Sequence, residues 1–345
     1  MIDNLITIDT SSQIPVYKQI IEQITNKIQT GEYAAGELLP SMNELSDQLE
    51  ISKETIKKVY SILRKRELIE ATQGKGFFVT DRTKNRKLKI LLLFDKISTY
   101  KQVLYDSFAH QMDNHADTTI RLHNQDIDVF EDFIDENLDM YDYYVITPHF
   151  PLDASIQKRV AKAISRIPNR KLILLDKNLE NLSGNYGAAY QDFHRDVYEG
   201  LMQGLKKIKK YAKLNVATSP SSMYAPFIKE GIERFGKDNN IEIEYHSTIS
   251  PEIIHNKELY LILNSQLDEG LIQLIRYAKE LKLKLGKDIG IISYNESPIN
   301  EIILDGLTTI STDFKQMGEL AAKMILEKNP RKIKCDFKLI KRNTF

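Results

Sequence analysis

Hydrophobic and polar positions follow two different patterns along the chain, and the pattern changes near residue 85. Before that point, apolar residues recur every three or four positions, as in amphipathic helices. The first such stretch predicts a helix that begins after Pro15 and ends at Gly31. Its apolar positions are Val16, Ile20, Ile24 and Ile28.

Two further helices and a hairpin are predicted before residue 81. Ser41 and Glu44 have the S-x-x-E spacing of a capping box, which predicts the start of a short second helix. Ser52 is the candidate N-cap of a third helix that ends near residue 66. Residues 68–80 then read as two short strands around a turn with Gly74 and Gly76, which supply the positive φ of a tight hairpin. Three helices and a hairpin predict a winged helix-turn-helix over residues 1–80.

After residue 87, continuous apolar runs alternate with amphipathic stretches. The run 88–94 is typical of a buried parallel strand. Further strands are expected at 118–123, 143–147, 171–176, 214–218, 241–245, 259–263, 289–293 and 307–312. Helices are expected between them, among others at 100–114, 153–167, 192–210, 224–239 and 268–285. This alternation predicts an α/β domain with parallel, doubly wound sheets, and its length favours two lobes. Residues 81–87 are polar and basic, and we interpret them as a linker.

Composition excludes several classes of protein. The chain has 345 residues, with 48 basic and 48 acidic side chains, so its net charge does not indicate nucleic-acid binding. Cys335 is its one cysteine, which excludes an intrachain disulfide and fits a reducing compartment. We see neither a signal-peptide pattern at the start nor an apolar run of the roughly 18 residues that a membrane span needs. We therefore expect a cytoplasmic protein that has no membrane partner.

Charge becomes informative locally, around the predicted third helix and hairpin. Basic residues outnumber acidic ones between 52 and 87, and such a local excess is the expected footprint of phosphate binding. The basic residues are Lys53, Lys57, Lys58, Arg64, Lys65, Arg66, Lys75, Arg82, Lys84, Arg86 and Lys87.

The same region resembles the DNA-binding domain of GntR-type transcriptional regulators. The matching elements are Leu39-Pro40-Ser41, Ile51-Ser52-Lys53, Thr55-Ile56-Lys57, Leu68-Ile69 and the wing Gln73-Gly74-Lys75-Gly76. The resemblance implies binding to double-stranded operator DNA. This family often has arginine where the present chain has Asn43, Lys53 and Lys57, and lysine lacks the bidentate geometry of arginine. The DNA contacts that the resemblance implies are Ser41, Asn43, Lys53, Glu54, Thr55, Lys57, Gly74 and Lys75.

The second region resembles the sugar-sensing domain of LacI-type repressors and ribose-binding-type periplasmic proteins. The stretch 288–328, "DIGIISYNESPINEIILDGLTTISTDFKQMGELAAKMILEK", carries the resemblance most clearly. It implies a periplasmic-binding-protein-like (type I) domain, whose two Rossmann-like lobes are joined by three crossings and hold a ligand in the cleft between them. We expect one lobe at 88–210 and 313–327, and the other at 211–306 and 330–345.

Ligands of parallel α/β sheets bind beyond the carboxyl ends of the strands. Polar and aromatic side chains follow the predicted strands, and this mixture suits a sugar with hydroxyls and apolar faces. The family's central ligand-binding arginine has no counterpart here, because Pro226 falls at that position. The effector-binding candidates are Asp95, Ser98, Tyr100, His149, Asp192, Phe193, Tyr224 and Asn295.

We find no phosphate-binding loop, zinc motif, G-x-G-x-x-G fingerprint or nucleophile elbow, and we expect no catalysis, cofactor or metal. The leading hypothesis is a homodimeric transcriptional regulator that acts as a repressor, not an activator, and is controlled by a monosaccharide. A pentose and a 6-deoxyhexose are the candidate effectors. Two alternatives remain open: the same regulator with a purine or another non-sugar effector, and a sugar-processing enzyme with an attached DNA-binding domain.

Overall fold

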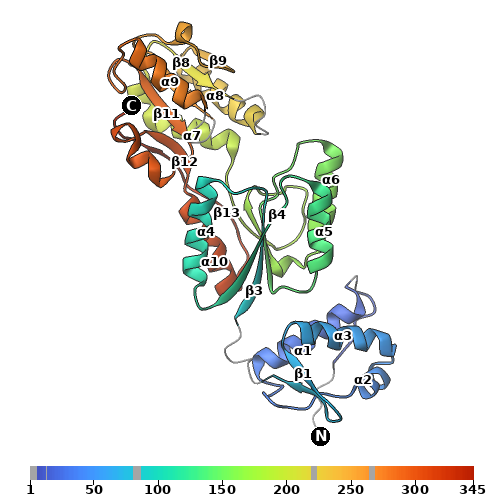
Figure 1. The fold of residues 1–345 in the computed structure, drawn as a ribbon. Coiled ribbons are helices and arrows are strands. Elements are labelled where there is room, and N and C mark those ends of the chain that lie inside the picture. The colour runs from blue at the N-terminus through green and yellow to red at the C-terminus, as the bar shows by residue number, and fades with distance from the viewer. Residues whose placement is uncertain (1–5, 13, 81–86, 219–223, 264–268) are drawn as a thin grey trace. The chain divides into compact units, whose positions relative to one another are not determined.

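The computed structural model describes residues 6–12, 14–80, 87–218, 224–263 and 269–345 (Figure 1). The chain divides into two compact units. One consists of residues 1–90, 114–119 and 135–142, and the other of residues 91–113, 120–134 and 143–345. Most of the expected linker, residues 81–86, lies outside the described residues, as do residues 219–223 of one expected ligand loop.

The first unit contains the predicted winged helix-turn-helix. Its helices are α1 (Val16–Thr30), α2 (Met42–Leu49) and α3 (Lys53–Lys65), and its wing is β1 (Ile69–Thr72) paired antiparallel with β2 (Gly76–Val79). The predicted capping box is confirmed, because the Ser41 side chain accepts from the backbone N–H of Glu44 and the Glu44 carboxylate accepts from that of Ser41. Gly31 ends α1 with φ 79°, which a glycine adopts without strain.

A single apolar core holds the three helices together. Ile20 and Ile24 of α1 and Ile56 of α3 are almost completely buried in it. Tyr60 of α3 is buried as well, and its hydroxyl donates a 2.5 Å hydrogen bond to the carbonyl of Pro40, just before α2. The opposite side of α3 contributes nothing to this core, so it can serve another purpose.

The rest of the chain forms two six-stranded sheets, each with helices on its faces (Figure 1). In the first sheet the strand order is β13-β7-β6-β5-β3-β4, and helices α4 and α10 pack closely together. The pairs β5–β6, β6–β7 and β7–β13 are parallel. The bounds are β3 Leu88–Phe94, α4 Thr99–Met112, β4 Ala116–Leu122, α5 Ile127–Asn137, β5 Tyr143–Ile146, α6 Ala154–Ile164, β6 Leu172–Asp176, β7 Gly187–Tyr190, α10 Phe314–Leu326 and β13 Lys332–Lys334.

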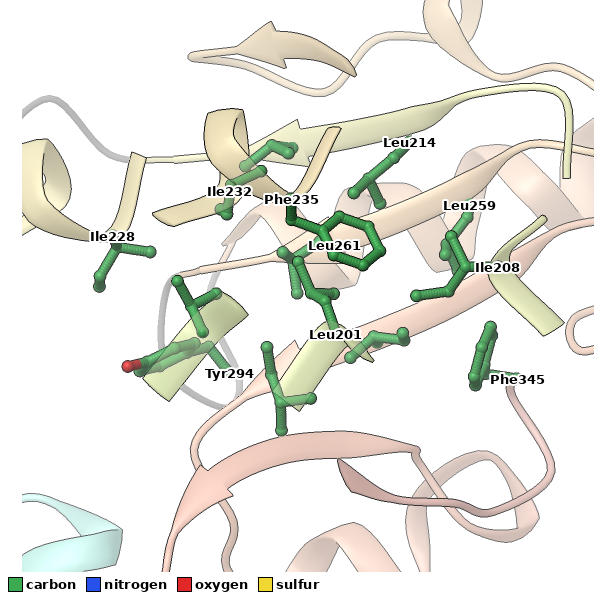
Figure 2. Packing of buried hydrophobic residues seen from close by; sticks show 14 of the residues in the cluster. Leu201, Ile208, Leu214, Ile228, Ile232, Phe235, Leu259, Leu261, Tyr294 and Phe345 are labelled. Carbon is green, nitrogen blue, oxygen red and sulfur yellow. The ribbon is translucent and has the colours of Figure 1, made fainter. Parts of the chain in front are cut away.

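In the second sheet the order is β14-β12-β11-β10-β8-β9, and among the described strands only the β12–β14 pair is antiparallel. Helices α7 and α8 cover one face, where Phe235 packs among Leu201, Leu214 and Leu261 (Figure 2). Helix α9 covers the other face through Leu271. The bounds are α7 Phe193–Ile208, β8 Leu214–Ala217, α8 Ala225–Asn239, β9 Ile243–His246, β10 Leu259–Ile262, α9 Glu269–Glu280, β11 Gly290–Tyr294, β12 Thr309–Thr312 and β14 Phe337–Ile340.

The chain passes between the two sheets three times, after β7, after β12 and after β13. The crossings are hydrogen-bonded to one another: Asp313 N donates to Asp336 O at 2.8 Å, and Cys335 N donates to Tyr190 O at 2.8 Å. Two segments lie elsewhere than the expected boundaries put them. Helix α7 belongs to the second lobe, because its apolar face completes the core of that sheet, and β13 belongs to the first lobe, because it pairs with β7. None of the helices described here is long and apolar enough to span a membrane.

Candidate functional site

Helix α3 presents a polar face that its core residues leave free. Ser52 begins the helix, since its side chain accepts from the backbone N–H of Thr55, and the two hydroxyl groups lie 2.8 Å apart. Lys53 and Lys57 are exposed, one turn apart, and Lys57 Nζ lies 3.6 Å from a carboxylate oxygen of Glu54. Both side chains are largely in water, so this ion pair holds Lys57 only weakly. The lysines therefore remain available to phosphates or bases.

Lys58 has a different environment from Lys57, although it is adjacent in sequence. Its Nζ lies 3.7 Å from the centre of the Tyr17 ring on α1, which is close enough for a cation–π contact. This contact directs Lys58 toward α1 and away from the face that Lys53 and Lys57 share. Lys53 and Lys57 thus lie on the outward face of α3, whereas Lys58 packs against α1.

Arg66, at the end of α3, is also unavailable to a ligand. Its side chain is buried within the first unit, where Nε donates a 2.6 Å hydrogen bond to the carbonyl of Asp139. Fewer side chains are therefore available to bind phosphate than the excess of basic residues between 52 and 87 suggests.

The remaining predicted DNA contacts lie on α2 and the wing. Ser41 and Asn43 are exposed at the start of α2. Gly74 and Lys75 form the exposed tip of the wing, where Gly74 has φ 73° and Lys75 N donates to Thr72 O at 3.0 Å. A left-handed φ at this position favours glycine, which explains why the turn contains one.

A second group of functional side chains gathers where the strands of the two sheets end, within the second unit. We call it the interlobe cluster. Its members come from the ends of β3, β5, β6, β7 and β11 and from the starts of α4, α7 and α8. They are Asp95, Tyr100, Lys101, Thr147, His149, Asp176, Gln191, Phe193, Tyr224 and Tyr294.

Asp95 is held by protein groups on one side of the cluster. It is 2% exposed, its carboxylate pairs with Lys101 Nζ, and it accepts a 3.0 Å hydrogen bond from the Thr147 hydroxyl. Burial acts to raise the pKa of Asp95, but the charges of Lys101 and His149 and the hydrogen bond from Lys101 together outweigh burial and lower it. The carboxylate is therefore ionised, and much of its hydrogen-bonding capacity is already used.

A second buried pair lies beside the first. His149 Nε2 is 3.0 Å from Asp176 Oδ2, and the other oxygen of Asp176 accepts from the Gln191 amide. Burial acts to raise the pKa of Asp176, whereas His149 and Lys101 lower it, with lowering as the net result. Asp176 is thus an ionised carboxylate in the interior, stabilised by charge and hydrogen bonds together.

Aromatic rings from both lobes meet at this pair. The rings of Phe193 and Tyr224 stack, with centroids 4.1 Å apart and an interplanar angle of 5°. The His149 ring meets the edge of Tyr224 at 5.0 Å, and Lys177 Nζ lies 5.7 Å from the centre of the Tyr224 ring. Tyr100 belongs to another aromatic pair, 4.5 Å from Phe314. The cluster therefore combines flat apolar surfaces with carboxylate, imidazole and hydroxyl groups.

The structure separates the predicted effector residues into two kinds. His149, Phe193 and Tyr224 are in mutual contact. Ser98 and Asp192, in contrast, are N-caps, because their side chains accept from the backbone N–H groups of Lys101 and Arg195 at the starts of α4 and α7. Asn295 follows β11 with φ 72°, and its backbone N–H donates to Ile310 O at 2.9 Å.

Sequence reasoning missed five members of the cluster: Lys101, Thr147, Asp176, Gln191 and Tyr294. Asp176 is the last residue of a predicted buried strand, where a carboxylate is unusual, and this position was a usable signal. Thr147 and Gln191 directly follow β5 and β7, and Tyr294 ends β11, so all three lie at the carboxyl ends of strands, where ligand contacts are expected. Lys101 offers no such signal, because a lysine in the first turn of an amphipathic helix ordinarily faces solvent.

Comparison with known proteins supports both halves of this description. Residues 16–79 match the model for bacterial regulatory proteins of the gntR family, and residues 259–341 match a periplasmic binding protein-like domain. The repressor YtrA of Bacillus subtilis is 29% identical over 105 residues, which are 30% of this chain and 78% of YtrA. The chain spans only 40% of MngR of Escherichia coli and 36% of NagR of Bacillus subtilis, two further repressors that it matches.

Solved structures share the fold of the second region. The Lac repressor dimer bound to operator and the anti-inducer ONPF superposes with a TM-score of 0.58, at 16% identity, over 77% of this chain and 99% of that one. A LacI-type regulator from Alkaliphilus metalliredigens, solved with D-xylulofuranose, superposes with a TM-score of 0.56, at 15% identity, over 75% of this chain and 99% of that one. The chain thus joins an N-terminal DNA-binding domain of the GntR type to a periplasmic-binding-protein-like domain with the fold of LacI-type regulators.

Proposed function

We propose that this chain is a sequence-specific transcriptional regulator, and that it represses transcription by binding an operator as a homodimer. The observation that carries the proposal is the exposed, basic face of α3 in a domain that matches the gntR family. Two-fold symmetric operators are read by dimers whose recognition helices enter successive major grooves. The Lac repressor, whose fold the second region shares, was solved as a dimer on its operator. Such a role requires access to DNA, so we place the protein in the cytoplasm.

Within the winged helix, Lys53, Thr55 and Lys57 are the central proposed contacts, because both lysines are exposed on α3 and Thr55 lies between them at the start of the helix. Lysine supplies a point charge to phosphates and a donor to guanine, whereas Asn43 offers the amide geometry that pairs with adenine. The remaining proposed contacts are Ser41, Glu54, Gly74 and Lys75.

The interlobe cluster is the proposed effector site. The stacked pair Phe193–Tyr224 and the polar groups of His149 and Asp176 suit a small sugar, which has apolar faces and hydroxyls. A pentose or a 6-deoxyhexose has the size and polarity that we expect of the effector. The regulator from Alkaliphilus metalliredigens that shares this fold was solved with a five-carbon sugar. Asp95, Ser98, Tyr100, Asp192 and Asn295 complete the proposed set.

Regulation then follows from the two-lobed design. A sugar that binds both lobes favours the arrangement in which they grip it, and it shifts the DNA-binding equilibrium by its difference in affinity for the two arrangements. We expect the sugar to weaken operator binding. Binding rather than catalysis fits the cluster, since its carboxylates are already engaged with cations or an imidazole.

The test is fluorescence anisotropy of the full chain on operator DNA obtained by selection from a random library. Each candidate sugar is added in turn, and Lys53→Glu and Lys57→Glu are compared with Lys237→Glu, an exposed position on α8. We expect the first two variants to lose operator binding and the third to retain it. No selection of a consensus sequence by the wild-type chain would overturn the regulatory function.

A second candidate effector is a purine, favoured by the parallel stack of Phe193 and Tyr224 beside a carboxylate. A thermal-shift screen separates the classes, because a bound ligand stabilises by about 2.7 kcal/mol at a hundredfold excess over its Kd. Stabilisation by nucleobases and not by sugars would reassign the effector and leave the DNA-binding function unchanged.

A further inference from the structure

Two tyrosine hydroxyls in the interlobe cluster are buried and have no hydrogen-bond partner among the described residues. The side chain of Tyr224, at the start of α8, is 8% exposed, and that of Tyr294, at the end of β11, is 3% exposed. Neither hydroxyl meets a donor or acceptor within the part of the chain that the structure describes. A buried tyrosine hydroxyl ordinarily finds a partner, because leaving it unpaired costs free energy.

Both hydroxyls face the same polar region. The negative charge of Asp176 acts on each of them, and so does the nearby Tyr100, although burial is the first cause of their raised pKa values. The Tyr294 ring lies at the margin of the second lobe's core, and its hydroxyl points away from Leu201 and Leu261 (Figure 2). The two groups therefore come from the second lobe and lie close enough to Asp176, at the end of β6 in the first lobe, to be affected by its charge.

The fully paired tyrosine of the same lobe provides a contrast. Tyr260 is as deeply buried, but its hydroxyl donates to the carbonyl of Ile253 and accepts from the backbone N–H of His255, both at 2.9 Å. The second lobe thus provides hydrogen-bond partners for the hydroxyl of a buried tyrosine that has a structural role. Tyr224 and Tyr294 differ from it in position, since they lie where the lobes meet.

Charges around the cluster are balanced before any ligand arrives. Lys334 Nζ lies 2.5 Å from Asp196 Oδ1, in addition to the Asp95–Lys101 pair. Lys177 is half-buried near Tyr224, and its Nζ donates to the side-chain oxygen of Gln157 at 3.3 Å. Among the described residues, the charged groups around the cluster include the four carboxylates of Asp95, Asp176, Asp192 and Asp196. The cations include the ammonium groups of Lys101, Lys177 and Lys334, and the imidazolium of His149, when it is protonated beside Asp176, is the fourth.

This balance constrains the ligand. A phosphate or carboxylate added here would leave an uncompensated negative charge in a largely buried site, and an amine would leave a positive one. An uncharged ligand leaves the balance intact. Hydroxyl groups, which both donate and accept, match the two unpaired phenol groups in either role.

Building on the proposed effector site, we propose that Tyr224 and Tyr294 are hydrogen-bond partners of the effector in the second lobe, and that the effector is an uncharged polyhydroxylated molecule. A free sugar meets this description, and a sugar phosphate, sugar acid or nucleotide does not.

The variants Tyr224→Phe and Tyr294→Phe test the role of the hydroxyls, with Tyr260→Phe as the matched control. In the ligand-free full chain, the first two should leave the melting temperature unchanged or raise it, because an unpaired polar group is removed. Tyr260→Phe should lower the melting temperature, because its hydroxyl is bonded. Lowering by all three variants alike would assign the two tyrosines a structural role and overturn the proposal.

Calorimetric titration tests the ligand class. The probes are D-ribose, D-xylose, L-arabinose and L-fucose, each alone, and D-ribose 5-phosphate and D-glucose 6-phosphate as charged counterparts. We expect at least one free sugar to bind, both phosphates to bind at least tenfold more weakly than it does, and each of the two phenylalanine variants to weaken its binding about tenfold. Binding of a phosphate as tight as that of the free sugars would overturn the proposal, as would unchanged affinity in both variants.

The two levels of interpretation fail separately. If a free sugar binds and alters operator affinity equally in the wild type and in both variants, the assignment of the tyrosines is wrong and the regulatory function stands. If no free sugar binds, the ligand class is wrong at both levels. If operator binding is absent altogether, sugar titration still decides the roles of Tyr224 and Tyr294.

Discussion

Gln191 and Thr312 are joined by a 2.8 Å hydrogen bond between side chains that are 121 residues apart in the sequence. Both are buried, and Gln191 also donates to Asp176. Gln191 lies at the first crossing between the lobes, and Thr312 is the last residue of β12, at the second. One amide therefore connects a carboxylate of the interlobe cluster to two of the three segments that join the lobes.

This connection predicts coupling between the two positions. Gln191→Leu should reduce the free energy of unfolding by about 1–3 kcal/mol, because it removes a hydrogen-bond donor from the buried Asp176 and the acceptor of the Thr312 hydroxyl. Thr312→Val should cost less, about 1 kcal/mol, and the double variant less than the sum. Urea denaturation of the four proteins gives the interaction energy, with ligand-free operator affinity as the control for a folded DNA-binding domain. Strict additivity would show that the hydrogen bond contributes nothing.

On α3, the expected distinction is between neighbouring lysines. Lys53→Met and Lys57→Met should each reduce the slope of log K against log[salt] for operator binding by about 0.9, the value for one lost phosphate contact on duplex DNA. Lys58→Met should leave the slope unchanged, because Lys58 lies over the Tyr17 ring. The measurement is anisotropy over a range of salt concentrations. A slope that falls for Lys58→Met but not for its neighbour would place the DNA on another side of the helix.

The pair Asp95–Lys101 gives a prediction about stability. Lys101→Met should destabilise the protein by about 3–5 kcal/mol, because it leaves a buried carboxylate uncompensated. Adding Asp95→Asn should recover much of this loss, since the amide has no charge to compensate. Chemical denaturation measures both variants. If the single and double variants are equally unstable, the charge of Asp95 is not what Lys101 stabilises.

His123 is expected to make stability depend on pH. Its ring is buried and stacks on Phe150 at 4.4 Å, Nε2 donates to Thr147 O at 3.1 Å, and Nδ1 accepts from Gln125 N at 3.2 Å. Burial lowers the pKa of His123 from 6.5 to about 4. Between these two values the unfolded chain binds more protons than the folded one, so stability falls as pH falls through this window.

The contribution of His123 to this loss is on the order of 3 kcal/mol at most, from a shift of about two and a half pKa units. His123→Gln should flatten the pH dependence between pH 6.5 and 4 in urea titrations. The control is His110→Gln, an exposed histidine on α4. An unchanged slope in His123→Gln, measured against this control, would mean that the imidazole is not the titrating group.

The regular elements could be predicted from sequence wherever one local pattern dominated. Capping residues Ser41 and Ser52 correctly predicted the starts of two helices. The continuous apolar runs of β3 and β6 correctly predicted strands that are buried on both faces of a sheet. Strand β7 escaped prediction because Gly187–Tyr190 is short and built of small residues. Its place is set by tight packing: a Cβ on Gly187 would lie 2.4 Å from the Ile173 side chain.

The candidate sites were predictable to different degrees for a related reason. The exposed positions of Lys53 and Lys57 could be predicted from the periodicity of one helix, because no contact with another element is needed to place them. The interlobe cluster instead depends on which strand ends lie side by side. The sequence indicated candidate loops, but not which of these loops contact one another. It could not foresee that Lys101 faces Asp95, or that Asp192 is occupied as an N-cap.

The contact between Lys58 and Tyr17 has an evolutionary consequence. It helps hold α3 against α1, whereas Lys53 and Lys57, which are proposed to contact DNA, are exposed and lie outside the apolar core of the domain. Substitutions at Asn43, Lys53 and Lys57 can therefore accumulate with little effect on folding. A duplicated copy of this gene would be free to acquire a new set of target promoters while it kept its original sensor.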